Sequence, residues 1–418
     1  MRRRSVKFGA PLAAIAILVA ACGSDSKSSS ETTAAPATTT PATTAAVADT
    51  TPATTAAPAD TTPETTAPPE TAAPVSLKDA GCPDPLVIQT DWFPEADHGW
   101  TYELVGQNGT LDAKAGKYSS EVGGITIEVR AGGPFVSFAS PAKQLYQDPS
   151  VFMAYVDTGD AIRNATTQPV VAVFVSYDKG PQLIQWDPAK YPDVKTIEDI
   201  GATAGDGKIL YFDGGAYMDY LLGKKIVKKS QIDASYDGSP ARFVAEGDLF
   251  QQGFATSEPY SYENLIDGWK KPVAFALVDD TGFKIYQSAL SVRPAAITEN
   301  ADCLKAVVPM FQKSLVSYMT NPGPTNSKLT EIVTEMAQFW QLSDDLNNDA
   351  TKKMKDLKLV TDGGNGYVGD MDCDRVQKLI DEFNPIEKAN NVEGVKDGLT
   401  CAEIVDNSFL DTSISLGF

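Results

Sequence analysis

The stretch 86–99 reads LVIQTDWFPEADHG, and the order of its side chains indicates the class of fold. The apolar run 85–90 has the length of a buried strand, and the turn-forming residues that begin at Asp91 end it. A helix is expected from Trp100 onward. A buried strand, a polar loop and a helix in this order are the opening of a βαβ unit. The loop also holds three carboxylates and the one histidine of the chain, which makes it a candidate binding site.

The residues after this loop continue the alternation of strands and helices. Strands are predicted at 125–130, 151–155 and 170–177, and helices at 141–147 and 159–167. Strands separated by helices favour parallel neighbours, because a parallel pair needs a crossover connection. The sequence therefore predicts an α/β fold with mostly parallel sheets.

The alternation then starts again, which predicts a second lobe. We assign 186–269 to this lobe, and 76–185 and 270–345 to the two parts of the first lobe. Strands between 273 and 293 are expected to return the chain to the first lobe. The remainder, 346–418, is predicted to be a helical extension that packs on the first lobe. Two connections between α/β lobes permit hinge motion, and the ligand of such a fold binds in the cleft, beyond the carboxyl ends of the strands.

The N-terminus has the features of an export signal. The basic segment 1–7 precedes the apolar run 11–21, which is too short to cross a bilayer, so 1–21 is predicted to be a signal peptide. The tetrapeptide 19–22, Val-Ala-Ala-Cys, resembles the bacterial lipobox, in which the cysteine is diacylated. Lipidation of Cys22 would hold the protein at the outer face of a membrane by its lipid alone. The alternative is an ordinary signal peptide with a chance cysteine.

The range 22–75 is predicted to be a disordered tether. It consists almost entirely of Thr, Ala, Pro and Ser and contains no aromatic residue. Such a composition buries too little apolar surface to offset the entropy of ordering the chain. The tether indicates a location outside the cytoplasm and little about function, and O-linked sugars on it are an open possibility.

Charge and length limit the remaining choices. The chain has 55 acidic against 35 basic side chains and a net charge of −20, which argues against nucleic acid or anionic lipid as a partner and favours solubility. About 340 residues follow the tether, too many for one ordinary core, so two lobes are expected. We expect a monomer that needs no cofactor.

Four cysteines follow Cys22. An even number in an exported chain predicts two disulfides, for which three connectivities are possible. We favour Cys373–Cys401, because these two residues bracket one compact segment, and therefore also Cys82–Cys303. A metal site is not expected, because the sequence has no C-x-x-C motif and one histidine.

Three groups of residues are candidates for ligand contacts. Rings of Trp92 and His98 can stack on a planar heterocycle while a carboxylate such as Asp91 accepts its N–H groups. The alternative is that Trp92 belongs to the core and that His98 caps the helix. The turn Gly214-Gly215-Ala216 follows a strand and opens a helix, where free N–H groups favour an anionic or carbonyl group, although a plain β-to-α connection is the more common role of such a turn. Ser176 and Tyr177 end a strand and add hydroxyl groups.

Three motifs together resemble the solute-binding proteins of ABC transporters for thiamine-pyrimidine precursors and sulfonates. The first is the stretch 86–99, whose strand ends in Asp-Trp followed by acidic residues and a histidine. The others are Ala-Gly-Gly-Pro at 131–134 and the segment 253–259, GFATSEP, which is similar to the Thr-Asn-Glu-Pro turn of that family. The resemblance spans 86–302. Ser257 stands where the family usually has Asn, which puts a polar contact there in doubt.

The resemblance implies a two-lobed periplasmic-binding-protein-like fold of the second topological type. It also implies a small ligand, often a nitrogen heterocycle, and an ABC permease as partner, with no catalytic residue. Trp92 and His98 would then stack on or orient the ring, and Glu258 would accept its amino or ring N–H group. A pyrimidine precursor, a flavin-like ring and a sulfonate stay open as ligands, in that order.

The sequence leaves two alternative functions open. Some relatives of this family are enzymes that make the thiamine pyrimidine from their own histidine and a pyridoxal cofactor, using a cysteine-rich motif. This chain has no adjacent cysteines, and export would separate it from the cofactor. A surface receptor with the same fold and no permease is the second alternative.

Overall fold

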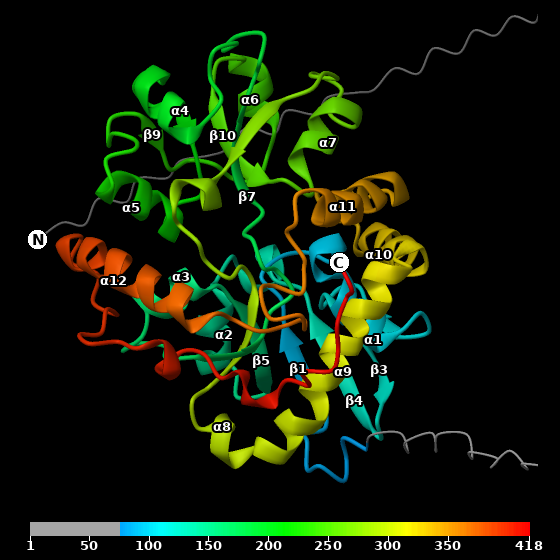
Figure 1. The fold of residues 1–418 in the computed structure, drawn as a ribbon. Helices are drawn as coiled ribbons and strands as arrows, with labels where there is room; N and C mark the ends of the chain where they lie inside the picture. Colours follow the sequence, from blue (N-terminus) through cyan, green and yellow to red (C-terminus); the bar gives the residue numbers. More distant parts are fainter. Residues whose placement is uncertain (1–75) are drawn as a thin grey trace, which may run out of the picture. The chain divides into compact units, whose positions relative to one another are not determined.

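The computed structural model describes residues 76–418 (Figure 1). The predicted signal peptide, Cys22 and the tether lie outside the described residues. Within 76–418, no helix combines the length and the apolar character that a membrane crossing requires.

The first sheet is organised around the strand that the sequence placed first. In β1 all four residues are buried, and this strand pairs in parallel with β4 and β5 on its two sides. The seven strands lie in the order β2-β3-β4-β1-β5-β12-β6. Their bounds are β1 (Leu86–Gln89), β2 (Thr110–Asp112), β3 (Lys117–Val122), β4 (Ile125–Arg130), β5 (Val151–Val156), β6 (Val171–Phe174) and β12 (Ala289–Val292).

The second sheet has five strands in the order β11-β7-β10-β8-β9. It forms the second lobe, seen at the top of Figure 1. Its strands are β7 (Gln182–Trp186), β8 (Ile209–Leu210), β9 (Ile232–Asp233), β10 (Phe250–Phe254) and β11 (Ala274–Leu277). The sheet thus reaches beyond the range 186–269 at both ends, because β7 and β11 pair with each other instead of serving as links between lobes.

The prediction of mostly parallel sheets is wrong, because both sheets are mixed. Four strand pairs are parallel and six are antiparallel. In the first sheet the returning strand β12 enters between β5 and β6 and runs against both. The short connection between β3 and β4 joins antiparallel neighbours. Hydrophobic periodicity gives the position of a strand but not its direction, so it could not distinguish a crossover from a return.

Helices surround both sheets. The long helix α9 packs against α1 beside the first sheet. The helices are η1 (Ala96–His98), α1 (Gly99–Val105), η2 (Gly133–Val136), α2 (Pro141–Gln147), α3 (Thr158–Arg163), α4 (Ile197–Thr203), α5 (Ala216–Gly223), α6 (Ala241–Glu246), α7 (Glu258–Asn264), η3 (Val278–Thr281), α8 (Ala296–Glu299), α9 (Ala301–Thr320), α10 (Gly323–Met336), α11 (Asp344–Asp356), α12 (Cys373–Ala389), η4 (Cys401–Glu403) and η5 (Asn407–Phe409).

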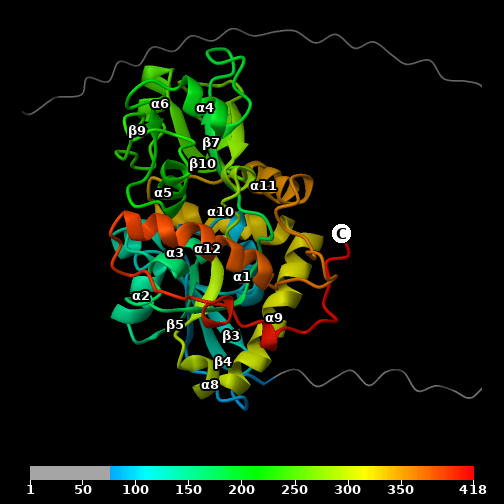
Figure 2. The same cartoon turned by 60° about the vertical axis from the view of Figure 1, so that its left-hand side comes forward.

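The C-terminal helices contact the first lobe, as expected, and also the second lobe, which was not expected. Helix α12 contacts α3 of the first lobe and α5 of the second, and α11 contacts η1 and α7. Figures 1 and 2 show both helices at the level where the lobes meet. An ion pair of 2.8 Å between Lys224 and Glu382 ties α5 to α12. The C-terminal segment therefore connects the lobes in addition to the chain crossings.

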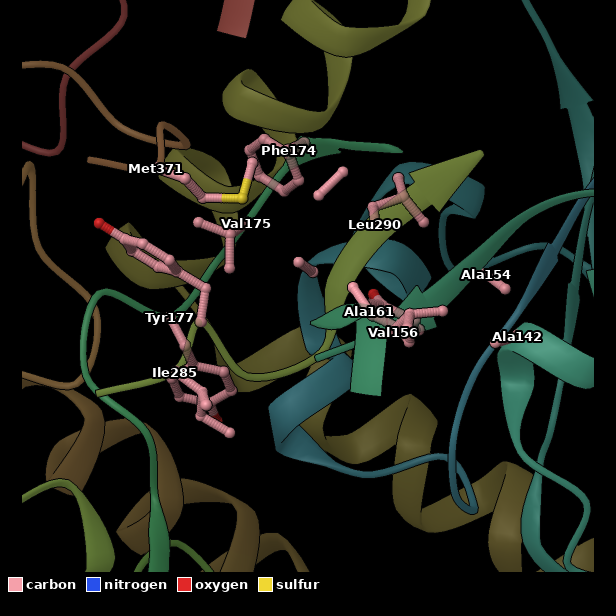
Figure 3. Close-up of a cluster of buried hydrophobic side chains, with 14 of the residues drawn as sticks. Ala142, Ala154, Val156, Ala161, Phe174, Val175, Tyr177, Ile285, Leu290 and Met371 are labelled. Carbon is pink, nitrogen blue, oxygen red and sulfur yellow. The ribbon is translucent and has the colours of Figure 1, made fainter. Parts of the chain in front are cut away.

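Tightly packed aromatic side chains form the core of the first lobe. The Trp100 ring is 4.8 Å from that of Phe174 and 5.4 Å from that of Phe311, centroid to centroid, and all three are buried. Figure 3 shows a neighbouring part of this core, with Val156 and Leu290 from adjacent strands and Tyr177 beside Ile285. Apolar contacts of this kind hold the ends of β5, β6 and β12 in fixed positions.

Two disulfides are present and have the connectivity that the sequence favoured, Cys82–Cys303 and Cys373–Cys401. The first joins residues 221 positions apart and fixes the segment before β1 to α9. The second closes a separation of 28 residues and fixes the start of α12.

We predict that replacing both Cys82 and Cys303 by alanine lowers the free energy of unfolding by roughly 2–5 kcal/mol, because the unfolded chain then regains the entropy of a long open loop. Urea unfolding of the oxidised proteins measures the loss. The matched control is the Cys373→Ala/Cys401→Ala variant. Its disulfide closes a shorter loop, so its removal should lower the free energy of unfolding by less. A larger loss in the control would contradict the prediction.

Candidate functional site

A cavity of about 290 Å³ lies where the segments after the carboxyl ends of β1, β5 and β6 face the second lobe. This volume suits a small ligand. Residues of both lobes and of the chain crossings line it: Asp91, Trp92, Glu95, Asp97, His98, Pro141, Tyr155, Asp157, Asp160, Tyr177, Gly180, Gln182, Phe212, Gly214, Gly215, Ala216, Tyr217, Tyr236, Gly238, Gln252, Gly253, Phe254, Ser257, Glu258, Val278, Asp279, Phe283, Ile285, Gln287, Ser288 and Trp340.

Asp91 and His98 form an ion pair in the lining of the cavity, in which His98 is buried and the Asp91 side chain is partly exposed. The Nε2 atom of His98 lies 2.7 Å from Oδ1 of Asp91, and its Nδ1 atom lies 3.0 Å from the carbonyl oxygen of Phe93. Both oxygens can only accept a hydrogen bond, so both ring nitrogens carry a proton and the imidazole is positively charged. The other carboxylate oxygen of Asp91 accepts a 2.5 Å bond from the Ser288 hydroxyl.

The pKa values of this pair move apart. Burial alone would raise the pKa of Asp91, but the charge and hydrogen bond of His98 and the bond from Ser288 hold it below its ordinary value. Burial opposes the protonated form of His98, yet the Asp91 carboxylate raises its pKa above the ordinary value. The His98 ring also stacks on the ring of Tyr155, with 5.2 Å between the ring centroids. With both nitrogens engaged, His98 positions Asp91 and has no N–H left for a ligand.

Asp97 joins the two lobes. Its Oδ1 atom accepts a 2.5 Å bond from the Tyr177 hydroxyl and a 2.8 Å bond from the hydroxyl of Thr256, which follows β10 of the second lobe. Burial raises the pKa of Asp97, although these two bonds lower it in part. The predicted residue Tyr177 therefore lies in the cavity wall, with its hydroxyl already bound to Asp97.

Glu258 begins α7 and enters the cavity from the second lobe. Its Oε2 atom accepts a 2.7 Å bond from the backbone N–H of Phe254. Burial raises the pKa of Glu258 to about 7, although bonds from backbone N–H groups lower it and Asp97 adds to the rise. A side chain on Gly253 would come within 2.8 Å of the Glu258 carboxyl group, so the glycine leaves room for it.

Aromatic rings form one wall of the cavity. Trp92 is at the centre, with ring centroids 6.0 Å from Phe212 of the second lobe and 5.8 Å from Trp340. Tyr236 extends the wall beyond Phe212, and the centroids of these two rings are 4.7 Å apart. The sequence identified Trp92 alone among these four. Phe212, Tyr236 and Trp340 follow different elements, and no spacing in the sequence links them.

The predicted glycine turn also reaches the cavity, whereas Ser176 does not line it. Gly214, Gly215 and Ala216 lie at the start of α5, with Gly215 as the residue that precedes its first turn. Ser176 is buried, and its hydroxyl has no hydrogen-bond partner among the described residues. Five carboxyl groups line the cavity that were not among the predicted site residues: Glu95, Asp97, Asp157, Asp160 and Asp279. The acidic 91–97 loop was the signal that could have pointed to Glu95.

The fold and the cavity define the class of protein: a two-lobed periplasmic-binding-protein-like fold of the second type, with two mixed sheets and C-terminal helices. No group of His, Cys, Asp or Glu side chains within 76–418 has the arrangement of a metal site.

Solved structures share this fold at low sequence identity. The alkanesulfonate-binding protein SsuA from Xanthomonas axonopodis pv. citri, solved with MOPS, aligns over 78% of this chain and 99% of its own, with 13% identity and a TM-score of 0.50. The periplasmic aliphatic sulphonate binding protein SsuA from Escherichia coli aligns over 77% of this chain and 91% of its own, with 12% identity and a TM-score of 0.49. No protein-family model matches the chain, and no curated protein shows significant sequence similarity to it.

Proposed function

We propose that this protein is the solute-binding component of an ABC importer, which captures a small molecule between its lobes and delivers it to a membrane permease. The observation that carries the proposal is the cavity, which both lobes line at the carboxyl ends of their strands. That position is where α/β folds bind ligands. Export, lipidation at Cys22 and a tether would place it at the outer surface of the cell membrane.

Contacts between the lobes support capture by closure. Arg163 of α3 donates a 2.6 Å bond to the carbonyl oxygen of Gly214 and a 2.8 Å bond to Asp219, both in the second lobe. The Thr256–Asp97 bond adds a third connection on the cavity side. A ligand that contacts both lobes would favour this closed arrangement over an open one.

The ligand that we propose is a small nitrogen heteroaromatic compound similar in size to a thiamine precursor. Trp92 would supply a face for the ring. Glu258 retains an oxygen, Oε1, for an N–H group of the ligand, since the Phe254 bond uses Oε2. Asp91, Tyr177 and the turn 214–216 would make the remaining contacts, and His98 would hold Asp91.

A thermal-shift screen tests this function. We expect a thiamine pyrimidine precursor or riboflavin to raise the melting temperature in proportion to the logarithm of its concentration, because a ligand that binds the native state alone stabilises it. Alkylsulfonates complete the panel, and calorimetry gives the stoichiometry of any hit. If no compound of any class binds at one molecule per chain, the proposed function is wrong.

A further inference from the structure

The cavity has a strong excess of acidic side chains. Among the described residues, 76–418, seven carboxyl groups line it and no lysine or arginine does. Within the same range His98 is the one basic side chain of the lining, and its two nitrogens are committed to Asp91 and the Phe93 carbonyl oxygen. The acidic residues come from both lobes and from the crossings: Asp91, Glu95, Asp97, Asp157, Asp160, Glu258 and Asp279.

Some of these carboxyl groups have protein partners and others do not. Asp91 is paired with His98, and Asp279 lies 3.7 Å from Arg375 and 3.9 Å from Lys284. The Glu95 carboxylate has no hydrogen bond and no ion pair within 76–418, although it is partly buried and faces the cavity. Its pKa is raised well above the ordinary value by burial and by the neighbouring charges of Asp97, Asp91 and Glu258. The cavity therefore holds acidic groups that no positively charged side chain of the lining neutralises.

We propose that the ligand carries a positive charge: an organic cation whose ammonium or ring nitrogen lies among Glu95, Asp97 and Glu258 while its apolar part contacts Trp92. This inference rests on the proposed function and adds the charge of the ligand to it. A cation would replace repulsion among partly buried carboxylates by attraction to them.

The aromatic wall is suited to the same ligand. A cation over the face of a tryptophan or tyrosine ring is attracted by the ring quadrupole, and the effect grows when water is excluded. Trp92, Phe212, Tyr236 and Trp340 place four rings in a cavity that also holds the acidic groups. A sulfonate would need cationic or N–H donors; the turn 214–216 offers backbone N–H groups, but the seven carboxyl groups of the lining disfavour an anion, so the sulfonate alternative is the least favoured.

If the ligand is a cation, its binding should also release protons from carboxyl groups of the cavity. Burial raises the pKa of Glu258 to about 7, and burial together with Asp160 raises the pKa of Asp157 to about 8. Asp97, Glu95, Tyr236 and Tyr262 interact electrostatically with Glu258, while Asp160, Arg163 and Asp91 interact with Asp157. A bound cation favours the ionised carboxylates, so binding near neutral pH releases protons and affinity rises with pH through this range.

Calorimetry with matched pairs of probes tests the inference on the exported chain, residues 22–418, without its signal peptide. The pairs are 1-methylnicotinamide against nicotinamide, and choline against its neutral isostere 3,3-dimethylbutanol, with methanesulfonate as the anion. We expect at least one cation to bind about 100-fold tighter than its neutral partner, with proton release near pH 7, and no binding of methanesulfonate.

A variant assigns the effect to the cavity. Glu95→Gln should weaken binding of the tightest cation at least tenfold and leave the affinity for its neutral partner unchanged. The control, Glu299→Gln, removes an exposed carboxylate outside the cavity and should change neither. Binding of a neutral or anionic compound in preference to every cation would overturn this inference and leave the proposed function intact. Failure of all probes and all screened compounds to bind would overturn both.

Discussion

The His98→Ala variant is expected to lose about 3–5 kcal/mol of unfolding free energy. His98 is 2% exposed and supplies the positive charge for Asp91, which lies 2.7 Å away. Removal of His98 leaves the partly buried Asp91 carboxylate without its counter-charge, and its surroundings solvate it less well than water does. The Ser288 hydroxyl would remain as the one side-chain donor to Asp91. Urea unfolding followed by fluorescence, at pH 6, measures the change.

A double-mutant cycle separates the ion pair from simple loss of packing. Asp91→Asn removes the charge that His98→Ala leaves unpaired, so the double variant should be clearly more stable than the sum of the two single losses predicts. Additive losses would show that the pair is not coupled and would contradict the assignment of His98 as the residue that positions Asp91.

The pH dependence of the pair follows from the directions of its pKa shifts. The raised pKa of His98 gives stability that is complete below its unfolded value, about 6.5, and is lost as pH rises through the folded value. The lowered pKa of Asp91 gives stability that is complete above its unfolded value, about 3.9, and is lost as pH falls through the folded value. The difference between wild type and His98→Ala should therefore be largest between about pH 4 and 6.5. A difference that grows above pH 8 would be inconsistent with this pair.

Trp92→Ala is expected to have the largest effect on binding. Trp92 contacts Phe212 of the second lobe as well as Trp340, so its loss removes a ligand face and part of the contact that closes the cavity. Buried tryptophans at binding sites cost about 2 kcal/mol or more when truncated, which corresponds to roughly a 30-fold loss of affinity. The measurement is ligand-induced thermal stabilisation with the tightest-binding compound of the probe panel.

Two controls make this result specific to the cavity. Trp92→Phe keeps an aromatic face and should retain most of the stabilisation. Trp269→Ala removes a tryptophan that packs in the second lobe and does not line the cavity, and its ligand-induced shift should equal that of wild type. A full shift in Trp92→Ala would exclude Trp92 from the site.

Several parts of the fold could be predicted from the sequence because they depend on local pattern. The buried run of β1 and the polar loop after it are adjacent in the chain, and their order already indicates an α/β unit. The repeat of alternating strands and helices identified a second lobe. The mixed pairing of both sheets was missed, since the direction of β12 and the edge position of β11 are set by where the chain returns.

The candidate site shows the same division at the level of residues. Asp91, Trp92 and His98 were found because one loop holds them all, and Glu258 was found through a similar turn. Phe212 and Trp340 reach the same cavity from two distant segments and carry no local signal of their own. Glu95 lay within the noted loop, but only its surroundings show that its carboxylate lacks a partner.

The sequence by itself indicated the α/β fold and the loop that begins the site, and it favoured the disulfide pairs that are present. Export and the tether stay predictions, because they concern residues outside 76–418. The tertiary structure decided which acidic residues share one cavity, how the C-terminal helices link the lobes, and why His98 is a partner of Asp91. Local backbone preferences and hydrophobic periodicity act over a few residues, and the sequence displays them directly. Electrostatic interaction depends on distance and burial, which exist only once segments from both lobes have come together.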